Sequence, residues 1–235
     1  MGVARAPPKG YQKAMLFRDF SHVRDWVFDL DHTLYPASSQ LFGQLDVKME
    51  RFLMRELGLA QPEAAKIRHS YWQNHGTTLA GLMHHHGTDP HVYLAEVQQI
   101  DFSVLTPNPS LREAIAALPG RKIVFTNGSR DYAQKATEAL GINDVFEAHF
   151  GIDDADFICK PAPQAFDTIF AKANISHAQA AMFEDDPRNL ATPHALGLKT
   201  VLVGPKKPAR HIHHHTDDLT AFLKQIVEPT DANSV

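Results

Sequence analysis

Two acidic residues separated by one residue follow a short apolar run near the start of the chain. In "VFDLDHTLYP" (residues 27–36), Asp29 and Asp31 come directly after Val27 and Phe28. Carboxylates rarely lie beside a hydrophobic core unless a partner compensates their charge. The pair therefore either caps a turn at the end of a strand or holds a metal ion and takes part in catalysis.

Three further polar groups occur later in the chain. They are Thr126 with Asn127 in "KIVFTNG", Lys160 in "CKPAP", and Asp185 with Asp186 in "AAMFEDD". Carboxylates can bind Mg²⁺, which prefers oxygen ligands, and an ammonium and a hydroxyl can hold a phosphoryl group. An aspartate can attack phosphorus, and a second acid can move the proton. For the two later aspartates, the simpler interpretation is a helix N-cap.

The elements expected to position these residues alternate between strand and helix. Apolar strands are expected at 23–28 and 122–128, and in "AHFGI", "AAMFE" and "KTVLVG", with helices between them at about 111–118, 130–140 and 166–173. Such alternation predicts an α/β fold with a Rossmann-like parallel sheet covered on both faces. Ligands bind at the carboxyl ends of the strands of such sheets, where we expect the polar groups to converge.

A helical block interrupts this alternation after the first strand. Leu45, Met49, Phe52 and Leu57 lie at helical spacing, and Gly58 follows as a C-cap. Further helices are expected after Pro62 and near 79–83 and 92–97. We therefore predict an inserted all-helical cap over residues 36–101, with residues 1–35 and 102–235 forming the α/β catalytic core.

Composition restricts the classes of partner. The 235 residues are 43% hydrophobic and 21% charged, with a net charge of −4 and one cysteine. No lysine–arginine stripe indicates nucleic-acid binding, and no apolar run reaches the ~20 residues of a membrane span. A single cysteine allows no intrachain disulfide, and we see no signal-peptide pattern. These features predict a cytoplasmic protein that acts on neither nucleic acid nor membrane.

The order of the motifs adds a family resemblance. "DLDHT" resembles the first motif of the haloacid dehalogenase superfamily, Thr126 in "VFTNGS" its second, Lys160 in "CKPAP" its third, and "FEDDPRN" its acidic fourth. The resemblance spans roughly residues 23–204, and the helical insertion lies where one branch of the family places its cap. A lone Asp-x-Asp-x-Thr is a weak signal, whereas four motifs in order are a strong one.

The resemblance implies a catalytic role for the two acids of the first motif. Asp29 would be the nucleophile and a ligand of Mg²⁺, the implied cofactor. Asp31 would be the general acid and base and would offer its backbone carbonyl to the metal, and Asp185 would complete the metal shell. An aspartyl phosphate would form and then be hydrolysed.

The other motifs imply phosphate binding and charge compensation. Thr126 would bind the transferring phosphoryl oxygens with the Asn127 backbone nearby, and Lys160 would stabilise both the nucleophile and the phosphate. Glu184 stands where many members have glycine, and Asn189 where some have another acid. The roles of Asp186 and Asn189 therefore stay open.

The implied activity is a magnesium-dependent phosphomonoesterase acting on a small phosphorylated metabolite. "DLDHTLYP", "TNGS" and "CKP" most resemble the pyrimidine 5′-nucleotidase-like branch, which implies a nucleoside monophosphate as substrate. Three alternatives stay open: a phosphatase of a sugar phosphate or phosphoglycolate, a 2-haloacid dehalogenase, and a non-catalytic metal-binding module.

Histidines and aromatic residues receive simpler interpretations. The chain has 15 histidines, clustered at 84–86 and 211–215. Adjacent histidines on a helix point ~100° apart, so the first triplet cannot chelate one ion by itself, whereas alternate histidines of an extended second cluster could share a face. Packing is expected for four aromatic residues that could otherwise stack on a base: Tyr35, Phe42, Tyr71 and Trp72.

Overall fold

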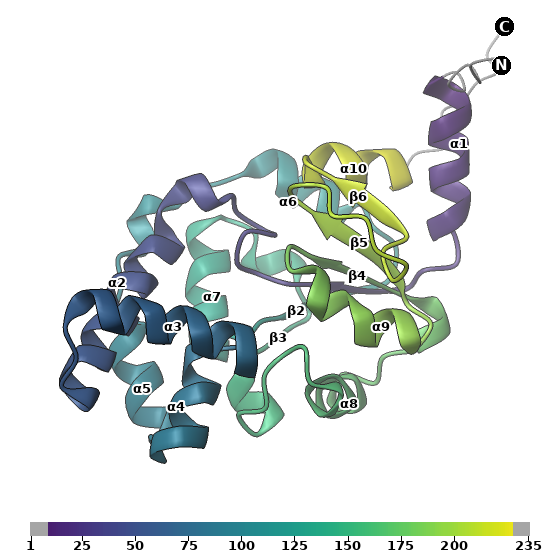
Figure 1. Cartoon of the computed structure of the whole chain (residues 1–235). Helices are drawn as coiled ribbons and strands as arrows, with labels where there is room; N and C mark the ends of the chain where they lie inside the picture. The colour runs from purple at the N-terminus through teal and green to yellow at the C-terminus, as the bar shows by residue number, and fades with distance from the viewer. Residues whose placement is uncertain (1–8, 228–235) are drawn as a thin grey trace, which may run out of the picture.

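A six-stranded parallel sheet forms the centre of the molecule, as predicted. The computed structural model describes residues 9–227, and the strands follow the order β3-β2-β1-β4-β5-β6 (Figure 1). All five neighbouring pairs are parallel. The strands are β1 (Asp25–Phe28), β2 (Arg121–Phe125), β3 (Ala148–Phe150), β4 (Ala180–Glu184), β5 (Lys199–Val203) and β6 (His214–Thr216).

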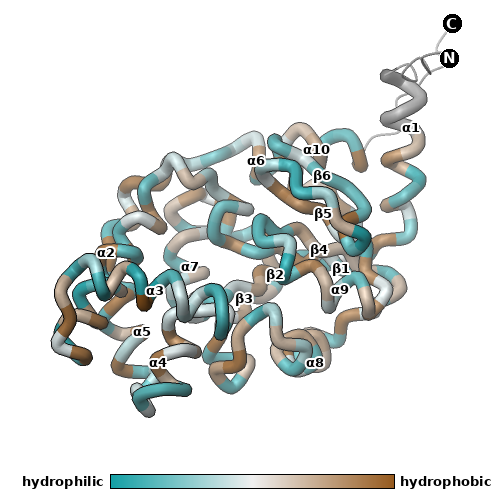
Figure 2. The backbone as a smooth tube through the Cα atoms, in the orientation of Figure 1, coloured by the Kyte–Doolittle hydropathy of each residue, from teal (hydrophilic) through white to brown (hydrophobic). Residues whose placement is uncertain are grey.

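Helices cover both faces of this sheet (Figure 1). One apolar layer joins the sheet to α1 (Lys9–Phe20), α6 (Pro109–Ala116), α7 (Arg130–Ala139) and α10 (Leu219–Val227). The other layer joins it to α8 (Pro163–Lys172), and α9 (Ala191–Ala195) lies on the same side (Figure 1). Successive residues of a strand point to opposite faces. Trp26 and Phe28 accordingly lie in the first layer and Val27 in the second, so the middle of the sheet is mostly hydrophobic (Figure 2).

Four helices between β1 and β2 form a separate group beside the sheet (Figure 1). They are α2 (Leu41–Leu57), α3 (Gln61–His75), α4 (Thr78–His86) and α5 (Pro90–Val97). Gly58 ends α2 with a φ of 65°, a left-handed conformation that favours glycine. Thr77 and Asp89 cap the starts of α4 and α5 through their side chains. We propose that residues 36–101 are the cap and that residues 1–35 and 102–235 are the core.

Short 3₁₀ helices connect several of these elements. They are η1 (Ala37–Ser39), η2 (Phe102–Val104), η3 (Asn143–Val145), η4 (Ile152–Ala155), η5 (His177–Gln179) and η6 (Pro187–Leu190). Pro193 lies in the first turn of α9, where a proline loses no intrahelical hydrogen bond.

Three elements went unrecognised in the sequence: α1, β6 and α10. In α10, Leu219, Phe222, Leu223 and Ile226 are buried, and their spacing is a helical signal. No helix within residues 9–227 is long and apolar enough to cross a bilayer.

His149 on β3 predicts a pH-dependent stability. Its side chain is buried beside Thr137, with 2.9 Å between Nε2 and Oγ1, and burial lowers its pKa from 6.5 to about 4. The folded state then favours the neutral ring, so the free energy of unfolding should fall as pH drops from about 6.5 towards 4. The loss should reach at most about 3 kcal/mol.

Urea unfolding of wild type and His149→Gln across this pH range isolates the contribution of His149 from that of other titrating groups. The stability difference between the two proteins should change with pH. In contrast, the difference between wild type and His22→Gln, at an exposed histidine, should stay constant. A pH-independent difference for His149→Gln would contradict the assignment.

Candidate active site

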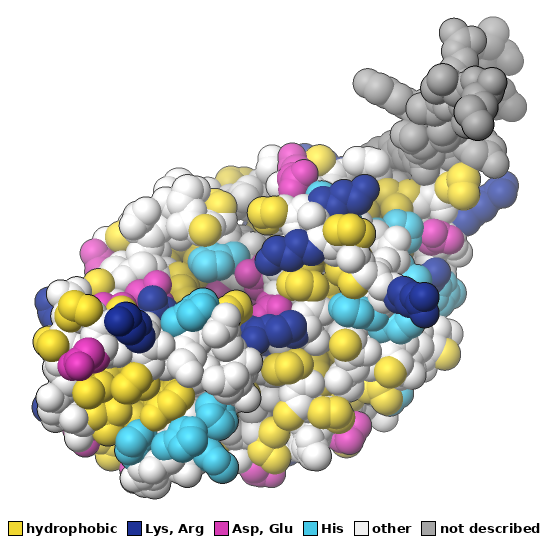
Figure 3. All heavy atoms as spheres, viewed as in Figure 1, with side chains coloured by type: hydrophobic (Ala, Val, Ile, Leu, Met, Phe, Trp, Pro, Cys, Tyr) yellow, Lys and Arg dark blue, Asp and Glu magenta, His cyan; other side chains and the backbone are white. Residues whose placement is uncertain are grey.

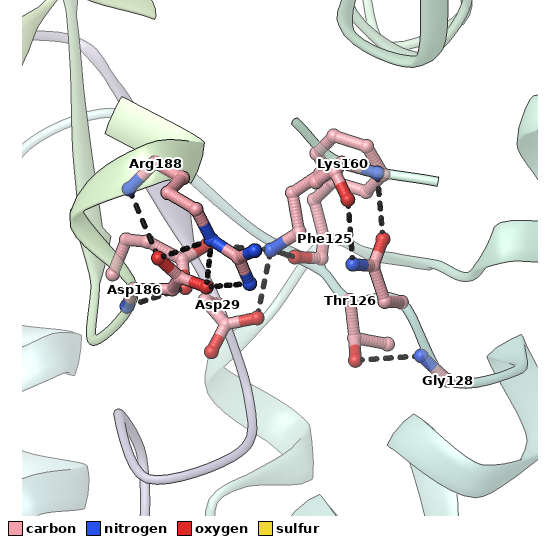
Figure 4. A network of polar contacts seen from close by, with 9 residues as sticks. Asp29, Phe125, Thr126, Gly128, Lys160, Asp186 and Arg188 are labelled. Carbon is pink, nitrogen blue, oxygen red and sulfur yellow. Dashed lines mark hydrogen bonds and ion pairs between the residues drawn. The ribbon is translucent and has the colours of Figure 1, made fainter. Parts of the chain in front are cut away.

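The carboxyl ends of adjacent strands bring the predicted residues together. Asp29 follows β1, Thr126 follows β2 and Asp185 follows β4, and β1 pairs with both other strands. The Asp29 backbone N–H donates to the Phe183 carbonyl at 2.9 Å, which extends the sheet pairing to the first acid. Lys160 reaches the same point from the segment between β3 and α8 (Figure 4).

The Lys160 ammonium lies at the centre of the site. Nζ donates to Asp29 Oδ1 at 2.7 Å, to Glu184 Oε2 at 2.7 Å and to the Phe125 carbonyl at 2.9 Å. These bonds use all three donors of the ammonium, and the side chain is only 1% exposed. Burial alone would lower the pKa of Lys160, but the two carboxylates outweigh that effect and raise it. The lysine therefore stays charged inside the protein.

Asn127 fixes the backbone of Lys160. Asn127 Oδ1 accepts from the Lys160 N–H at 2.8 Å, and Asn127 Nδ2 donates to the Lys160 carbonyl at 3.0 Å. Neighbouring Thr126 is fully buried, and its Oγ1 accepts from the Gly128 N–H at 3.0 Å (Figure 4). The Asn127 side chain thus positions the lysine, and its proposed part in phosphate binding is limited to the backbone.

Three carboxylates converge around the lysine. Oxygens of Asp29, Glu184 and Asp185 all lie within 4.8 Å of one another. Burial raises the pKa of Asp29 to about 7, with Lys160 opposing and Asp185 and Asp31 adding to the increase. Burial also raises the pKa of Glu184. A divalent cation would offset this repulsion, and carboxylate oxygens are ligands that Mg²⁺ prefers, so the donor set fits that ion.

Glu184 is the member of this group that the sequence interpretation missed. It was noted only as a departure from the family pattern at a position where glycine is common. In the structure Glu184 is the last residue of β4, so it reaches the same edge of the sheet as Asp185. The sequence signal that could have identified Glu184 is an acidic residue at the end of an apolar run that is expected to form a strand.

The Asp31 side chain has different partners. Its Oδ1 accepts hydrogen bonds from Tyr132 Oη at 2.6 Å and from Tyr35 Oη, and the two hydroxyls are 3.0 Å apart. His32 follows with a φ of 61°, in the left-handed region, so the chain turns directly after Asp31. Burial raises the pKa of Asp31, while the two tyrosine hydrogen bonds oppose the increase.

Within residues 9–227, the carboxylates that share a metal-sized space do not include the Asp31 side chain. The implied use of the Asp31 backbone carbonyl as a ligand stays a prediction. Tyr35 was expected to pack in the core or hinge and Tyr132 was not singled out. Their hydroxyls meet the site because α7 brings residue 132 beside the turn after β1, a long-range contact that spacing alone does not reveal.

The two adjacent acids after β4, Asp185 and Asp186, have different partners. The Asp185 carboxylate lies 3.6 Å from His32 Nδ1, and this contact raises the pKa of the histidine. Asp186 caps η6 by accepting from the Arg188 N–H at 3.0 Å and pairs with the Arg188 guanidinium at 2.6 Å (Figure 4). The N-cap interpretation therefore holds for Asp186, which leaves Asp185 to the metal-sized cluster.

A cavity of about 570 Å³ lies between these residues and the four-helix group. Asp29, Asp31, Asn127 and Asp185 line its floor, whereas Thr126 and Lys160 lie outside its lining. The helical group contributes apolar side chains to the lining, Phe42, Leu45, Met49, Leu79, Leu94 and Val97, and also polar or charged ones, Asp46, Arg68, His69, Thr77, Thr78 and Gln98. Acidic side chains show at the bottom of a hollow between the two parts of the molecule (Figure 3).

Several polar contacts join the helical group to the rest of the molecule near this cavity, among them a hydrogen bond from Cys159 Sγ to the His75 carbonyl at 3.2 Å. The Arg188 guanidinium stacks on the Trp72 ring at 4.0 Å and donates to the Trp72 carbonyl at 3.2 Å. Ser129 Oγ donates to Gln98 Oε1 at 2.5 Å. One border of the cavity is therefore a direct contact between α3 and η6. Another is a direct contact between the residue that follows α5 and the loop that follows β2.

Comparison with known families agrees with this architecture. A family model described as haloacid dehalogenase-like hydrolase matches residues 26–197. The chain belongs to this hydrolase family. The match includes the four motifs and the helical insertion between the first and second of them.

Three individual proteins that resemble this chain share between 18% and 32% of the aligned residues with it. "Phosphate metabolism protein 8" of Saccharomyces cerevisiae is 29% identical over 193 residues, which are 74% of this chain and 60% of that protein. "Validoxylamine A 7'-phosphate phosphatase" of Streptomyces hygroscopicus subsp. limoneus is 32% identical over 75 residues, 32% of this chain and 35% of that protein. A haloacid dehalogenase-family phosphatase from Thermococcus onnurineus shares the fold, with a TM-score of 0.60, 18% identity and coverage of 87% of this chain and 98% of its own.

The buried lysine predicts a large and pH-dependent stability effect. Lys160→Met would leave Asp29 and Glu184 buried without their ammonium, so we expect the free energy of unfolding at pH 8 to fall by about 3–5 kcal/mol. The two carboxylates would then have further raised pKa values, and protonation would relieve the repulsion. The destabilisation measured by urea should consequently be smaller at pH 5 than at pH 8.

Lys66→Met is the matched control, because Lys66 is exposed on α3. It should change the stability by no more than about 0.5 kcal/mol at either pH. A loss below about 1 kcal/mol for Lys160→Met at pH 8 would show that the ammonium does not hold the two carboxylates together.

Proposed function

We propose that this protein is a magnesium-dependent phosphomonoester hydrolase that acts through an aspartyl phosphate on Asp29. The observation that carries the proposal is the buried Lys160 ammonium between Asp29 and Glu184, with Asp185 beside them. The ammonium offsets the negative charge of the carboxylate that a phosphoryl group must approach, and a cation held by the carboxylates would supply the remaining positive charge. The names of the matched relatives, one a phosphatase and one a protein of phosphate metabolism, support the same class.

In the first step, the free oxygen of Asp29 attacks phosphorus while the bond between phosphorus and the ester oxygen breaks. Lys160 holds the other oxygen, Oδ1, at 2.7 Å and so orients the nucleophile. Asp31 gives its proton to the leaving oxygen. Mg²⁺ bound by Asp29, Glu184, Asp185 and the Asp31 carbonyl would supply charge that offsets the repulsion between carboxylate and phosphate.

In the second step, water attacks the phosphorus of the aspartyl phosphate, and the bond to Asp29 breaks. Asp31, now ionised, accepts the proton of that water, and inorganic phosphate leaves with both acids restored. Tyr35 and Tyr132 donate to one oxygen of Asp31. This arrangement stabilises the ionised form and leaves the second oxygen for proton transfer.

As substrate we propose a pyrimidine nucleoside monophosphate. A cavity of about 570 Å³ lies within the range usual for small-molecule sites. Its cap side offers Phe42, Leu45 and Met49, against which a base can pack. The cap side also carries Asp46, Arg68 and His69, whose polar groups can pair with the hydroxyl groups of a bound ribose.

Phosphate release from a substrate panel tests the activity. With Mg²⁺, UMP and CMP should be hydrolysed faster than AMP, GMP, phosphoglycolate or sugar phosphates, and EDTA should abolish release. Asp29→Asn should lower kcat/KM by at least about a thousandfold because it removes the nucleophile. Asp167→Asn, at an exposed aspartate of α8, should keep wild-type activity.

Each alternative result of the panel has a distinct meaning. Preference for a sugar phosphate would keep the mechanism and reject the nucleotide substrate. Halide release from 2-haloacids that survives EDTA would reject phosphatase chemistry in favour of a dehalogenase. Full activity of Asp29→Asn would show that the nucleophile is wrong.

Asp31→Asn should separate the two chemical steps. The leaving group of p-nitrophenyl phosphate needs no proton, so this variant should still phosphorylate Asp29 but hydrolyse the intermediate slowly. Stopped-flow absorbance should therefore show a burst of about one p-nitrophenol per site, followed by turnover about 10²–10⁴-fold slower than wild type. Linear release from the first turnover at the wild-type rate would remove Asp31 from the proton transfer.

A further inference from the structure

Two histidines from different helices converge away from the catalytic residues. His75 is the last residue of α3 and His85 lies in the last turn of α4. Their Nε2 atoms are only 2.9 Å apart. Histidine side chains gather on the surface at the α3–α4 part of the molecule (Figure 3), so the pair can be reached by a dissolved ion.

The separation of the two nitrogens suits a shared metal ion. With metal–nitrogen bonds of about 2.0–2.1 Å, two imidazole nitrogens lie about 2.9 Å apart at a 90° angle and about 3.4 Å apart at a tetrahedral angle. The observed 2.9 Å between His75 and His85 matches the 90° case. Tetragonal coordination by nitrogen is typical of Cu²⁺ and Ni²⁺.

His84 supplies a third ring nearby, although its nitrogens do not share a metal-sized space with those of His75 and His85 in the rotamer of this structure. The ring centres of His75, His84 and His85 are 5.1, 4.8 and 4.7 Å apart pairwise. Three imidazoles on one ion place their ring centres about 4.5–5.2 Å apart for the same bond lengths. His84 is exposed, so its ring is able to rotate until a nitrogen faces the ion, whereas His86 Nε2 is engaged by Tyr71 Oη at 2.8 Å.

Metal binding by this first cluster requires neutral imidazoles. The histidines of the second cluster, residues 211–215, are arranged differently in space. His211 Nε2 lies 2.8 Å from the Pro187 carbonyl, His213 Nδ1 lies 2.8 Å from Thr200 Oγ1, and the His215 ring contacts a different carbonyl. These three rings have separate partners and do not converge.

We propose that His75 and His85, completed by His84, form a Cu²⁺ or Ni²⁺ site that bridges α3 and α4. Residues 84–86 are not expected to chelate one ion by themselves, since adjacent helical side chains diverge. The missing ligand, His75, comes from the preceding helix. The site is separate from the carboxylates around Lys160 and does not depend on the proposed phosphatase activity.

The test is isothermal titration of the full chain with NiCl₂ or CuCl₂, with excess Mg²⁺ present to occupy the carboxylate cluster. Electron paramagnetic resonance of the Cu²⁺ complex should show hyperfine splitting from two or three nitrogens. His75→Gln and His85→Gln should each weaken the tight binding of one ion per chain at least about tenfold and remove nitrogens from the spectrum. His84→Gln should have a smaller effect.

His91→Gln is the matched control, because His91 is an exposed cap histidine whose ring packs on Phe157 instead. It should bind the ion as wild type does, and thermal melts of all variants without metal should confirm that they fold. Unchanged binding in both His75→Gln and His85→Gln, a spectrum with oxygen ligands only, or no binding by wild type would each overturn the proposal.

Discussion

The bonds of one buried ammonium hold the centre of this protein together. Lys160 neutralises Asp29 and Glu184 at 2.7 Å each, and its third donor reaches the Phe125 carbonyl at the end of β2. Without this cation, two carboxylates would lie in a region where an isolated charge is very unfavourable. The contact also joins segments distant in sequence, because the acids follow β1 and end β4 while the lysine precedes α8. Stability and chemistry therefore depend on the same charge.

The parallel sheet explains why these groups meet and why they need compensation. Adjacent strands β2, β1 and β4 end at one edge, and each delivers a polar residue there directly after a fully apolar segment. Burial then raises the pKa of Asp29 to about 7, which is the electrostatic cost of placing a nucleophile beside a core. A dication in the carboxylate cluster would lower that cost further. The four helices complete the arrangement by covering the strand ends with a mostly apolar roof.

Much of this was predictable from local sequence. Asp29, Thr126 and Asp185 were found because each follows a short apolar run, and the alternation of strands and helices implied a parallel sheet. Glu184, Tyr35 and Tyr132 were missed because their importance depends on which strand or helix lies beside them in space. Similarly, the bonds by which the Asn127 side chain holds the Lys160 backbone were not foreseen, and the part of the Asn127 backbone in phosphate binding stays a prediction. In α10 the helical spacing was present but went unused, whereas β6, with three residues, gives too short a pattern to identify.

The central claim is that Asp29 becomes phosphorylated during turnover, and chemical trapping tests it most directly. Protein quenched during hydrolysis of its best substrate would be treated with borohydride, which reduces an aspartyl phosphate to homoserine, and the peptide containing residue 29 would be examined by mass spectrometry. The account predicts homoserine at position 29 only when substrate and Mg²⁺ are both present. Sustained phosphate release with residue 29 unmodified under the same quench, or homoserine at another aspartate, would contradict it.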